Sequence, residues 1–177
     1  FAGKGFAQGA ASGIEPFHHL LSGSSMGIVE MGCNSGHIVR RLRAMGHQAW
    51  GYDLLEVIAR VERAEGEYYF ESCNLDAEEI PRGNSYIGLV LALGMVEHMW
   101  HPERLFDESY RVLVPGGYLF LTSTRDTVNI MHEQWHRRHF NRDSLTALAE
   151  AAGLVVQDIE ERVTAILATF RKPESAK

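Results

Sequence analysis

The feature that most constrains the fold of this 177-residue chain is a regular alternation of short apolar runs with helical patterns. Residues 27–31 (GIVEM) form a mostly apolar run that ends at Gly32, which is typical of a buried strand. Residues 36–45 follow, with apolar side chains on one helical face (Ile38, Val39, Leu42 and Met45). A strand followed at once by a helix predicts a parallel sheet with helical crossovers.

The same alternation continues along the rest of the chain. Further strands are expected at 48–52, 68–73, 86–93, 118–123, 154–159 and 164–170, and helices at about 55–64, 103–113 and 141–152. The run 86–93 is the most apolar and is expected at the centre of the sheet, and Pro115-Gly116-Gly117 is expected to break the chain. Only residues 160–163 separate the last two strands, which favours an antiparallel hairpin because a parallel crossover needs about a dozen residues. The pattern predicts an α/β, doubly wound, seven-stranded, mostly parallel sheet with a C-terminal antiparallel hairpin.

Length and composition indicate one ordinary globular domain over residues 1–177. Residues 1–25 are expected to be a flexible lead that includes a short amphipathic segment at 17–21, either a lid helix or a docking helix. A net charge of −6 argues against a nucleic-acid partner, and the longest apolar stretch is too short to enter a membrane. Two cysteines are too few for a disulfide framework, so we expect a cytoplasmic protein.

A glycine turn joins the first strand to the first helix. Gly32 and Gly36 allow a tight turn and close approach of a ligand, and Asn34 tolerates a left-handed backbone. Asp53 follows at the end of the second strand, where a carboxylate can accept hydrogen bonds from both ribose hydroxyls. The pair predicts a nucleoside-bearing ligand, although such a glycine is often only a tight turn. The dinucleotide fingerprint needs further glycines at positions occupied by Asn34 and His37, which disfavours a nicotinamide or flavin.

Several segments follow this turn in a fixed order. They are Asp53, Asp76-Ala77-Glu78 with Pro81, Val96-Glu97-His98, Arg111-Val112-Leu113-Val114-Pro115-Gly116-Gly117, and His139-Phe140 with Ala152-Gly153-Leu154. With Glu30 to Gly36 as a first motif, this series resembles the class I S-adenosylmethionine-dependent methyltransferases, particularly the small-molecule branch that includes quinone-biosynthesis enzymes. One departure is Gly88, where many relatives carry an aspartate.

The resemblance implies a Rossmann-like fold and an enzyme, a transferase that uses S-adenosylmethionine as its cofactor. It places the methionine end of the cofactor at Glu30, Gly32, Cys33, Asn34 and Gly36, the ribose at Asp53 and Leu54, the adenine at Asp76 and Ala77, and the amino-acid moiety over Leu93. The reaction implied is methyl transfer to an oxygen, nitrogen or carbon nucleophile of a small-molecule acceptor. The sequence leaves the acceptor and the oligomeric state open.

His98 follows the fourth strand and is the candidate general base, with a structural or substrate-lining role as the alternative. Its neighbour Glu97 is expected to be a solvated charge. Two segments are rich in aromatic residues and histidines: one contains Trp100 and His101, and the other contains His132, Trp135 and His136. Each segment could line the acceptor pocket or simply pack its loop onto the domain. Arg137, Arg138 and Arg142 are expected to be solvated surface charges, with contact to an anionic acceptor such as a phosphate or carboxylate as the alternative.

Two other classes of protein remain as alternatives. His132 to His136 matches the H-E-x-x-H zinc motif, but it precedes a helix start and lacks helical periodicity, so we expect a chance match and no metal. The remaining alternatives to a methyltransferase are a cofactor-binding protein without turnover and a nicotinamide-dependent oxidoreductase. The glycine turn and Asp53 favour binding of the cofactor, but they do not by themselves require catalysis.

Overall fold

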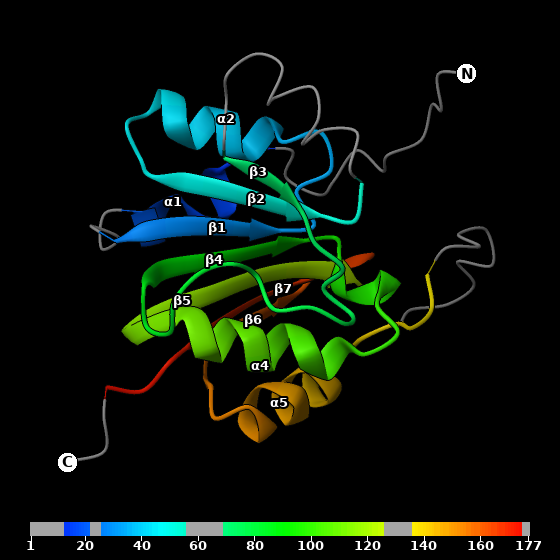
Figure 1. Ribbon diagram of the computed structural model, residues 1–177. Helices are drawn as coiled ribbons and strands as arrows, with labels where there is room; N and C mark the ends of the chain where they lie inside the picture. Colours follow the sequence, from blue (N-terminus) through cyan, green and yellow to red (C-terminus); the bar gives the residue numbers. More distant parts are fainter. Residues whose placement is uncertain (1–12, 22–25, 56–68, 126–135, 175–177) are drawn as a thin grey trace, which may run out of the picture.

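The computed structural model describes residues 13–21, 26–55, 69–125 and 136–174. These residues form one seven-stranded sheet with the order β3-β2-β1-β4-β5-β7-β6 (Figure 1). The strands are β1 (Gly27–Met31), β2 (Ala49–Asp53), β3 (Phe70–Ser72), β4 (Ile87–Leu93), β5 (Leu113–Thr124), β6 (Val155–Glu161) and β7 (Ala165–Arg171). Strands β1 to β5 pair in parallel, whereas β7 runs antiparallel to both β5 and β6. The predicted fold class and the C-terminal hairpin are confirmed.

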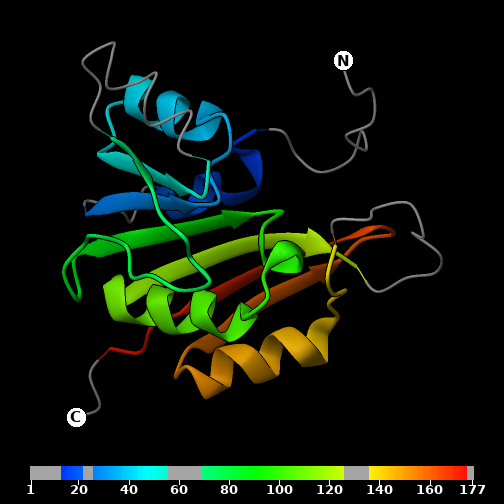
Figure 2. The same cartoon turned by 45° about the vertical axis from the view of Figure 1, so that its right-hand side comes forward.

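Helices cover both faces of this sheet (Figures 1 and 2). The 3-10 turn η1 (Glu15–Phe17), α1 (His18–Leu21) and α2 (His37–Ala44) pack on one face, and α4 (Pro102–Val112) and α5 (Arg142–Ala151) on the other. The helix expected at about 55–64 lies almost wholly outside the described residues. Among the helices that are described, we find none with the length and apolar character needed to cross a bilayer.

Strand β4 lies fourth of the seven, as its apolar sequence predicts. Its residues from Ile87 to Ala92 are all buried, because helices cover both sides of the sheet at this position. A strand of this kind buries side chains in both apolar clusters, Val90 in one and Leu91 in the other. Strand β4 is therefore packed against apolar side chains on both faces of the sheet.

The boundary of β5 differs from its prediction. We expected a break at Pro115-Gly116-Gly117 and a strand only from residue 118, but β5 begins at Leu113, which already pairs with Ile87. The Pro-Gly-Gly segment forms an irregularity within the ladder, where the register shifts and Gly116 has φ of +82°. A side chain at Gly117 would lie 3.0 Å from the carbonyl oxygen of Gly88. Glycine lets the backbone bulge without leaving the sheet.

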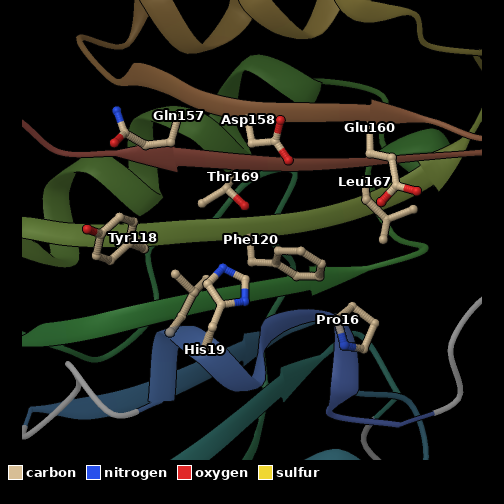
Figure 3. A pocket seen from close by; sticks show the side chains of 10 residues that line it. Pro16, His19, Tyr118, Phe120, Gln157, Asp158, Glu160, Leu167 and Thr169 are labelled. Carbon is tan, nitrogen blue, oxygen red and sulfur yellow. The ribbon is translucent and has the colours of Figure 1, made fainter.

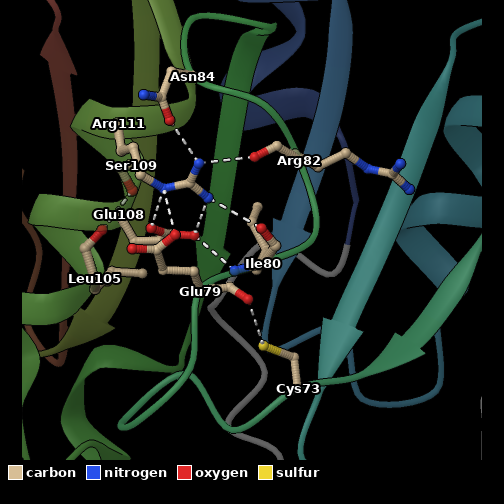
Figure 4. Close-up of polar contacts among 9 residues, drawn as sticks. All are labelled: Cys73, Glu79, Ile80, Arg82, Asn84, Leu105, Glu108, Ser109 and Arg111. Carbon is tan, nitrogen blue, oxygen red and sulfur yellow. Dashed lines mark hydrogen bonds and ion pairs between the residues drawn. The ribbon is translucent and has the colours of Figure 1, made fainter.

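The arginine of the 111–117 motif has a structural role in this fold (Figure 4). The guanidinium of Arg111 donates to Glu108 through Nε (2.7 Å) and Nη2 (2.6 Å), and to the carbonyl oxygens of Ile80 (3.0 Å) and Arg82 (2.8 Å). Glu108 in turn accepts from the backbone N–H of Ile80. The pair ties the segment before β4 to helix α4, and the network explains an arginine at this position without reference to catalysis.

The described part of the N-terminal region docks against the sheet. Phe17 is fully buried, and its ring centroid lies 5.5 Å from that of Phe120 on β5. A cavity of about 250 Å³ lies beside α1, on the sheet face formed by β5, β7 and β6 (Figure 3). Asp158 and Glu160 line this cavity from β6, and His19 lines it from α1. The cavity opens on the face of the sheet and not at the carboxyl ends of the central strands.

Candidate functional site

The carboxyl ends of β1 and β2 meet at the predicted glycine turn. The N–H groups of Gly32 (2.7 Å) and Cys33 (3.2 Å) both donate to the carbonyl oxygen of Tyr52, which joins the turn to the end of β2. Gly32, Asn34 and Gly36 have positive φ angles of +78°, +45° and +71°. The turn thus has the left-handed backbone that the residue types predicted.

Gly36 shows why this turn needs glycine. A Cβ atom at Gly36 would lie 2.3 Å from the ring of Phe70, and one at Gly32 would lie 2.7 Å from the side chain of Met95. Real Cβ atoms do not approach other atoms so closely, so a side chain at either position would displace its neighbour. The turn is a close-packed backbone cradle at the end of a parallel strand, which is where ligands bind in open α/β sheets.

Asp53 lies directly beside this turn, at the end of β2. Its Oδ2 accepts from the backbone N–H of Asn34 at 2.8 Å, and its Oδ1 accepts from that of Leu55 at 3.0 Å. Each carboxylate oxygen keeps a second lone pair, so the group can still accept from two hydroxyls. Leu54, which follows it, is 68% exposed. The fold thus brings together Asn34 and Asp53, which are 19 positions apart in the sequence, as predicted for the glycine turn and this carboxylate.

Glu30 is a buried carboxyl on β1, one residue before the end of the strand. It is only 3% exposed, and its Oε2 has no hydrogen-bond partner within the described part of the chain. Burial first and the charge of Asp53 second raise the pKa of Glu30, a hydrogen bond from the backbone N–H of Val39 lowers it, and the net result is a pKa of about 8. At neutral pH the group is mainly protonated, and a cation placed beside it would favour its ionised form.

The predicted adenine-side residue Asp76 makes an unexpected connection. Its Oδ1 accepts from the N–H of His101 at 2.8 Å and its Oδ2 from that of Trp100 at 3.2 Å. Ala77 beside it is exposed. This carboxylate joins the segment after β3 to the loop after β4, so a residue predicted to bind the adenine is hydrogen-bonded to two residues predicted to line the acceptor pocket.

The other predicted cofactor residues are placed as follows. Leu93 ends β4 half-buried, and the N–H of the next residue, Gly94, donates to Thr122 of β5. Cys33 is buried, and burial raises the pKa of its thiol well above the usual range. A protonated buried thiol is a packing group and a poor nucleophile, so Cys33 can contribute to the turn only through its backbone.

His98 lies beside a residue that the sequence placed on a distant loop. It follows β4 in the 3-10 turn η2 (Val96–His98), and its ring stands at 70° to that of His136 with centroids 4.8 Å apart. Of the other pocket residues predicted in this region, His132 and Trp135 lie outside the described residues. The loop after β4 and the segment before α5 therefore meet at the carboxyl end of the sheet.

Glu97 is not the solvated charge that the sequence suggested. It is 3% exposed, and its Oε1 accepts from both the backbone N–H and the hydroxyl of Thr124 at 3.0 Å. The pairing of β4 with β5 brings these residues together over 27 positions of sequence. The sequence signal that could have indicated this burial is the position of Glu97 directly after the most apolar strand.

The arginines expected at the surface fasten the loops of the site. The guanidinium of Arg137 lies 3.4 Å from the ring centroid of Trp100 and donates through Nε to the carbonyl oxygen of His98. Arg138 donates to the carbonyl oxygen of Trp100 at 2.8 Å, and Arg142 donates to that of Ile159. The side chain of Trp100 is still 59% exposed. All three arginines are exposed, as expected of surface charges, and they also donate to backbone carbonyls at the ends of loops.

Comparisons with known proteins agree with this geometry. A family model described as a methyltransferase domain matches residues 7–159. The chain belongs to this methyltransferase family. The match spans the glycine turn, Asp53 and the whole parallel part of the sheet. The prediction of a class I S-adenosylmethionine-dependent methyltransferase, with S-adenosylmethionine as the cofactor of the family, is confirmed.

Two curated relatives show the range of this methyltransferase family. A protein of Mycolicibacterium smegmatis named as a probable S-adenosylmethionine-dependent methyltransferase is 28% identical over 138 residues, which cover 74% of this chain and 52% of the relative. The mitochondrial ubiquinone biosynthesis O-methyltransferase of Mus musculus is 27% identical over 112 residues, which cover 59% of this chain and 30% of the relative. The chain thus spans about half or less of the length of these relatives.

A solved structure supports the same fold. The Burkholderia thailandensis 1,6-didemethyltoxoflavin-N1-methyltransferase, determined with 1,6-didemethyltoxoflavin and S-adenosylhomocysteine, superposes with a TM-score of 0.71 at 20% identity. The superposition covers 89% of this chain and 76% of the other. At this identity the likeness establishes the Rossmann-like methyltransferase fold.

Proposed function

We propose that this domain transfers the methyl group of S-adenosylmethionine to an oxygen, nitrogen or carbon nucleophile of a small-molecule acceptor. The observation that carries the proposal is the hydrogen-bonded contact between the glycine turn and Asp53, at 2.8 Å, in a chain of the methyltransferase family. The buried Oε2 of Glu30, which has no hydrogen-bond partner among the described residues, and a glycine turn at the carboxyl end of β1 both fit a cationic, nucleoside-bearing cofactor at this position.

The chain's own residues divide the binding of this cofactor among them. The residues assigned to the methionine end are Glu30, Gly32, the backbone of Cys33, Asn34 and Gly36. Those assigned to the ribose are Asp53 and Leu54, those assigned to the adenine are Asp76 and Ala77, and Leu93 is assigned to the amino-acid moiety. When bound, the cofactor supplies a methyl group on a sulfonium leaving group. The protein's contribution is to align the acceptor with that methyl group and to exclude water.

The acceptor side is assigned to the histidine-rich loops. His98 is exposed at the end of β4 and is the proposed general base for an acceptor that loses a proton on methylation. Trp100, His101 and His136, together with His132 and Trp135, are the proposed lining of the acceptor pocket. Arg137 and Arg138 already donate to backbone carbonyls, so these loops present an indole and imidazoles to an uncharged aromatic or hydroxyl-bearing acceptor more readily than guanidinium groups to a phosphate.

The experiment starts from binding and then measures transfer. Calorimetry with S-adenosylhomocysteine should show binding that Asp53→Ala weakens at least about tenfold, since a ribose-binding carboxylate is lost. Asp107→Ala, a substitution in helix α4 away from the turn, should leave that binding unchanged. Transfer of labelled methyl from S-adenosylmethionine is then measured over phenols, carboxylic acids and nitrogen heterocycles.

The outcomes separate the alternatives. Absence of S-adenosylhomocysteine binding to folded protein overturns the proposal. Binding without transfer to any acceptor of the panel favours a cofactor-binding protein without turnover. A nicotinamide-dependent oxidoreductase would instead bind a nicotinamide dinucleotide in preference, and membership of the methyltransferase family disfavours it.

A further inference from the structure

A cluster of three potential metal ligands lies at the carboxyl end of β4, outside the glycine turn. Glu97, His98 and His136 each place a ligand atom within 4.8 Å of the ligand atoms of the other two. They come from two segments far apart in sequence, η2 and the loop before α5. The ring of His139 lies 6.0 Å from that of His136, centroid to centroid, and adds a further imidazole at the rim.

The two segments are fastened to each other at this point. The backbone N–H of Arg137 donates to the carbonyl oxygen of Glu97 at 2.8 Å, and the Nε of Arg137 donates to that of His98 at 3.2 Å. These bonds hold His136 next to the Glu97–His98 pair. A metal site needs its ligands fixed by surrounding hydrogen bonds of this kind, because loose ligands lose affinity.

Glu97 supplies an independent sign of a missing ligand. One carboxylate oxygen, Oε1, is held by two donors of Thr124, so the orientation of the group is fixed. The other oxygen, Oε2, is buried and has no hydrogen-bond partner among the described residues. A buried carboxylate oxygen without a donor is costly unless a cation or proton meets it.

We propose that Glu97, His98 and His136 bind a divalent transition-metal ion of the Zn²⁺, Co²⁺ or Mn²⁺ class. Two imidazoles and one carboxylate suit such ions, whereas Mg²⁺ and Ca²⁺ prefer oxygen ligands alone. Three protein ligands leave a coordination position open, as in metal sites that act on a bound molecule. This ligand set differs from the H-E-x-x-H match at 132–136, from which it takes only His136.

The site has a chemical use that rests on the proposed methyl transfer. It lies at the carboxyl end of the sheet, on the side assigned to the acceptor. A divalent ion bound there would coordinate a hydroxyl or carboxylate oxygen of the methyl acceptor at its open position. Coordination would lower the pKa of a bound hydroxyl. The bound oxygen would then attack the methyl group as the bond from that carbon to the sulfonium sulfur breaks and S-adenosylhomocysteine leaves, and the released proton would pass to solvent. In this arrangement His98 is a metal ligand, which replaces the role of general base proposed for it above.

The test measures metal binding directly, apart from activity. Tag-free protein is dialysed against chelator and titrated with Co²⁺, whose visible absorption bands report ligand type, and with Zn²⁺ in the calorimeter. We expect one ion per chain, with affinity reduced at least about tenfold in Glu97→Gln, His98→Gln and His136→Gln. His18→Gln, which removes an exposed histidine of α1 outside the cluster, is the matched control. Far-UV circular dichroism and urea denaturation verify that each variant is folded.

The results decide the proposal independently of the methyltransferase assignment. Stoichiometric binding that all three variants weaken and His18→Gln does not supports the metal site, even if no acceptor is methylated. Absence of Co²⁺ and Zn²⁺ binding, or equal affinity in the three variants and the control, overturns it, even if methyl transfer is found. Thr124→Val removes the hydroxyl that orients Glu97 but leaves all three ligands, so it should weaken binding less than Glu97→Gln.

Discussion

Replacing Glu30 by glutamine should stabilise the folded protein above neutral pH. The structure buries the Glu30 carboxyl to 3% exposure and leaves its Oε2 without a partner among the described residues. Burial first, and the charge of Asp53 second, raise the pKa of Glu30 from 4.5 to about 8 in the folded protein. Glutamine keeps the size and polarity of the side chain but cannot ionise.

The sign and size of the effect follow from proton binding. Below pH 4.5 the carboxyl is protonated in both states, so it contributes no pH dependence. Between pH 4.5 and about 8 the folded state keeps a proton that the unfolded state has lost, so the free energy of unfolding decreases as pH rises. At about 1.4 kcal/mol per pH unit the full effect has an upper bound of about 5 kcal/mol, and relaxation of the surroundings reduces the expected value to about 2–4 kcal/mol.

Urea denaturation of wild type and Glu30→Gln at intervals from pH 5 to 9 measures this difference. The variant should gain on the wild type steadily up to about pH 8 and then remain ahead by a constant amount. When both proteins also carry Asp53→Asn, the pH at which the difference between them levels off should move lower, because the charge of Asp53 no longer raises the pKa of Glu30. Two parallel stability curves for wild type and Glu30→Gln would refute the reasoning.

Three further substitutions test the fold around the site. Arg111→Leu should lower the free energy of unfolding by about 2–4 kcal/mol by urea denaturation, because it removes the cationic partner of the mostly buried Glu108, and a cycle with Glu108→Gln should be clearly non-additive; additivity would contradict the network. Gly36→Ala should lower the free energy of unfolding by about 1–3 kcal/mol more than Gly46→Ala does, as measured by thermal unfolding, because both glycines have positive φ but only a Cβ at position 36 would meet another side chain. Equal losses of stability would count against the close-packed turn. Asn141→Ala should cost about 1 kcal/mol through loss of the capping box of α5, and no change in urea midpoint would argue against that cap.

The parts of the fold that sequence predicted are those determined by local patterns. The run 86–93 predicted the central strand, since burial on both faces requires a continuous apolar sequence. The short link at 160–163 predicted the antiparallel hairpin of β6 and β7. The predicted start of β5 was wrong because a Pro-Gly-Gly segment can form either a turn or a bulge, and pairing with β4 decides between the two.

The candidate site shows the same limit. Asp53 and the glycine turn belong to one strand–helix–strand unit, so their proximity follows from the fold class. The burial of Glu97 depends instead on Thr124, which lies on another strand. That contact does not follow from any local pattern, because the register of two strands joined by a long crossover depends on packing and not on nearby residues.

The hydrogen bonds of Asp76 connect two segments of the proposed site. This carboxylate was expected to serve the cofactor, yet it holds the N–H groups of Trp100 and His101 in the loop assigned to the acceptor. The same loop is held from its other side by Arg137, which stacks on Trp100 and donates to His98. We expect a cofactor bound at Asp76 to share this carboxylate with the loop of Trp100 and His101, so that cofactor binding changes the position of that loop.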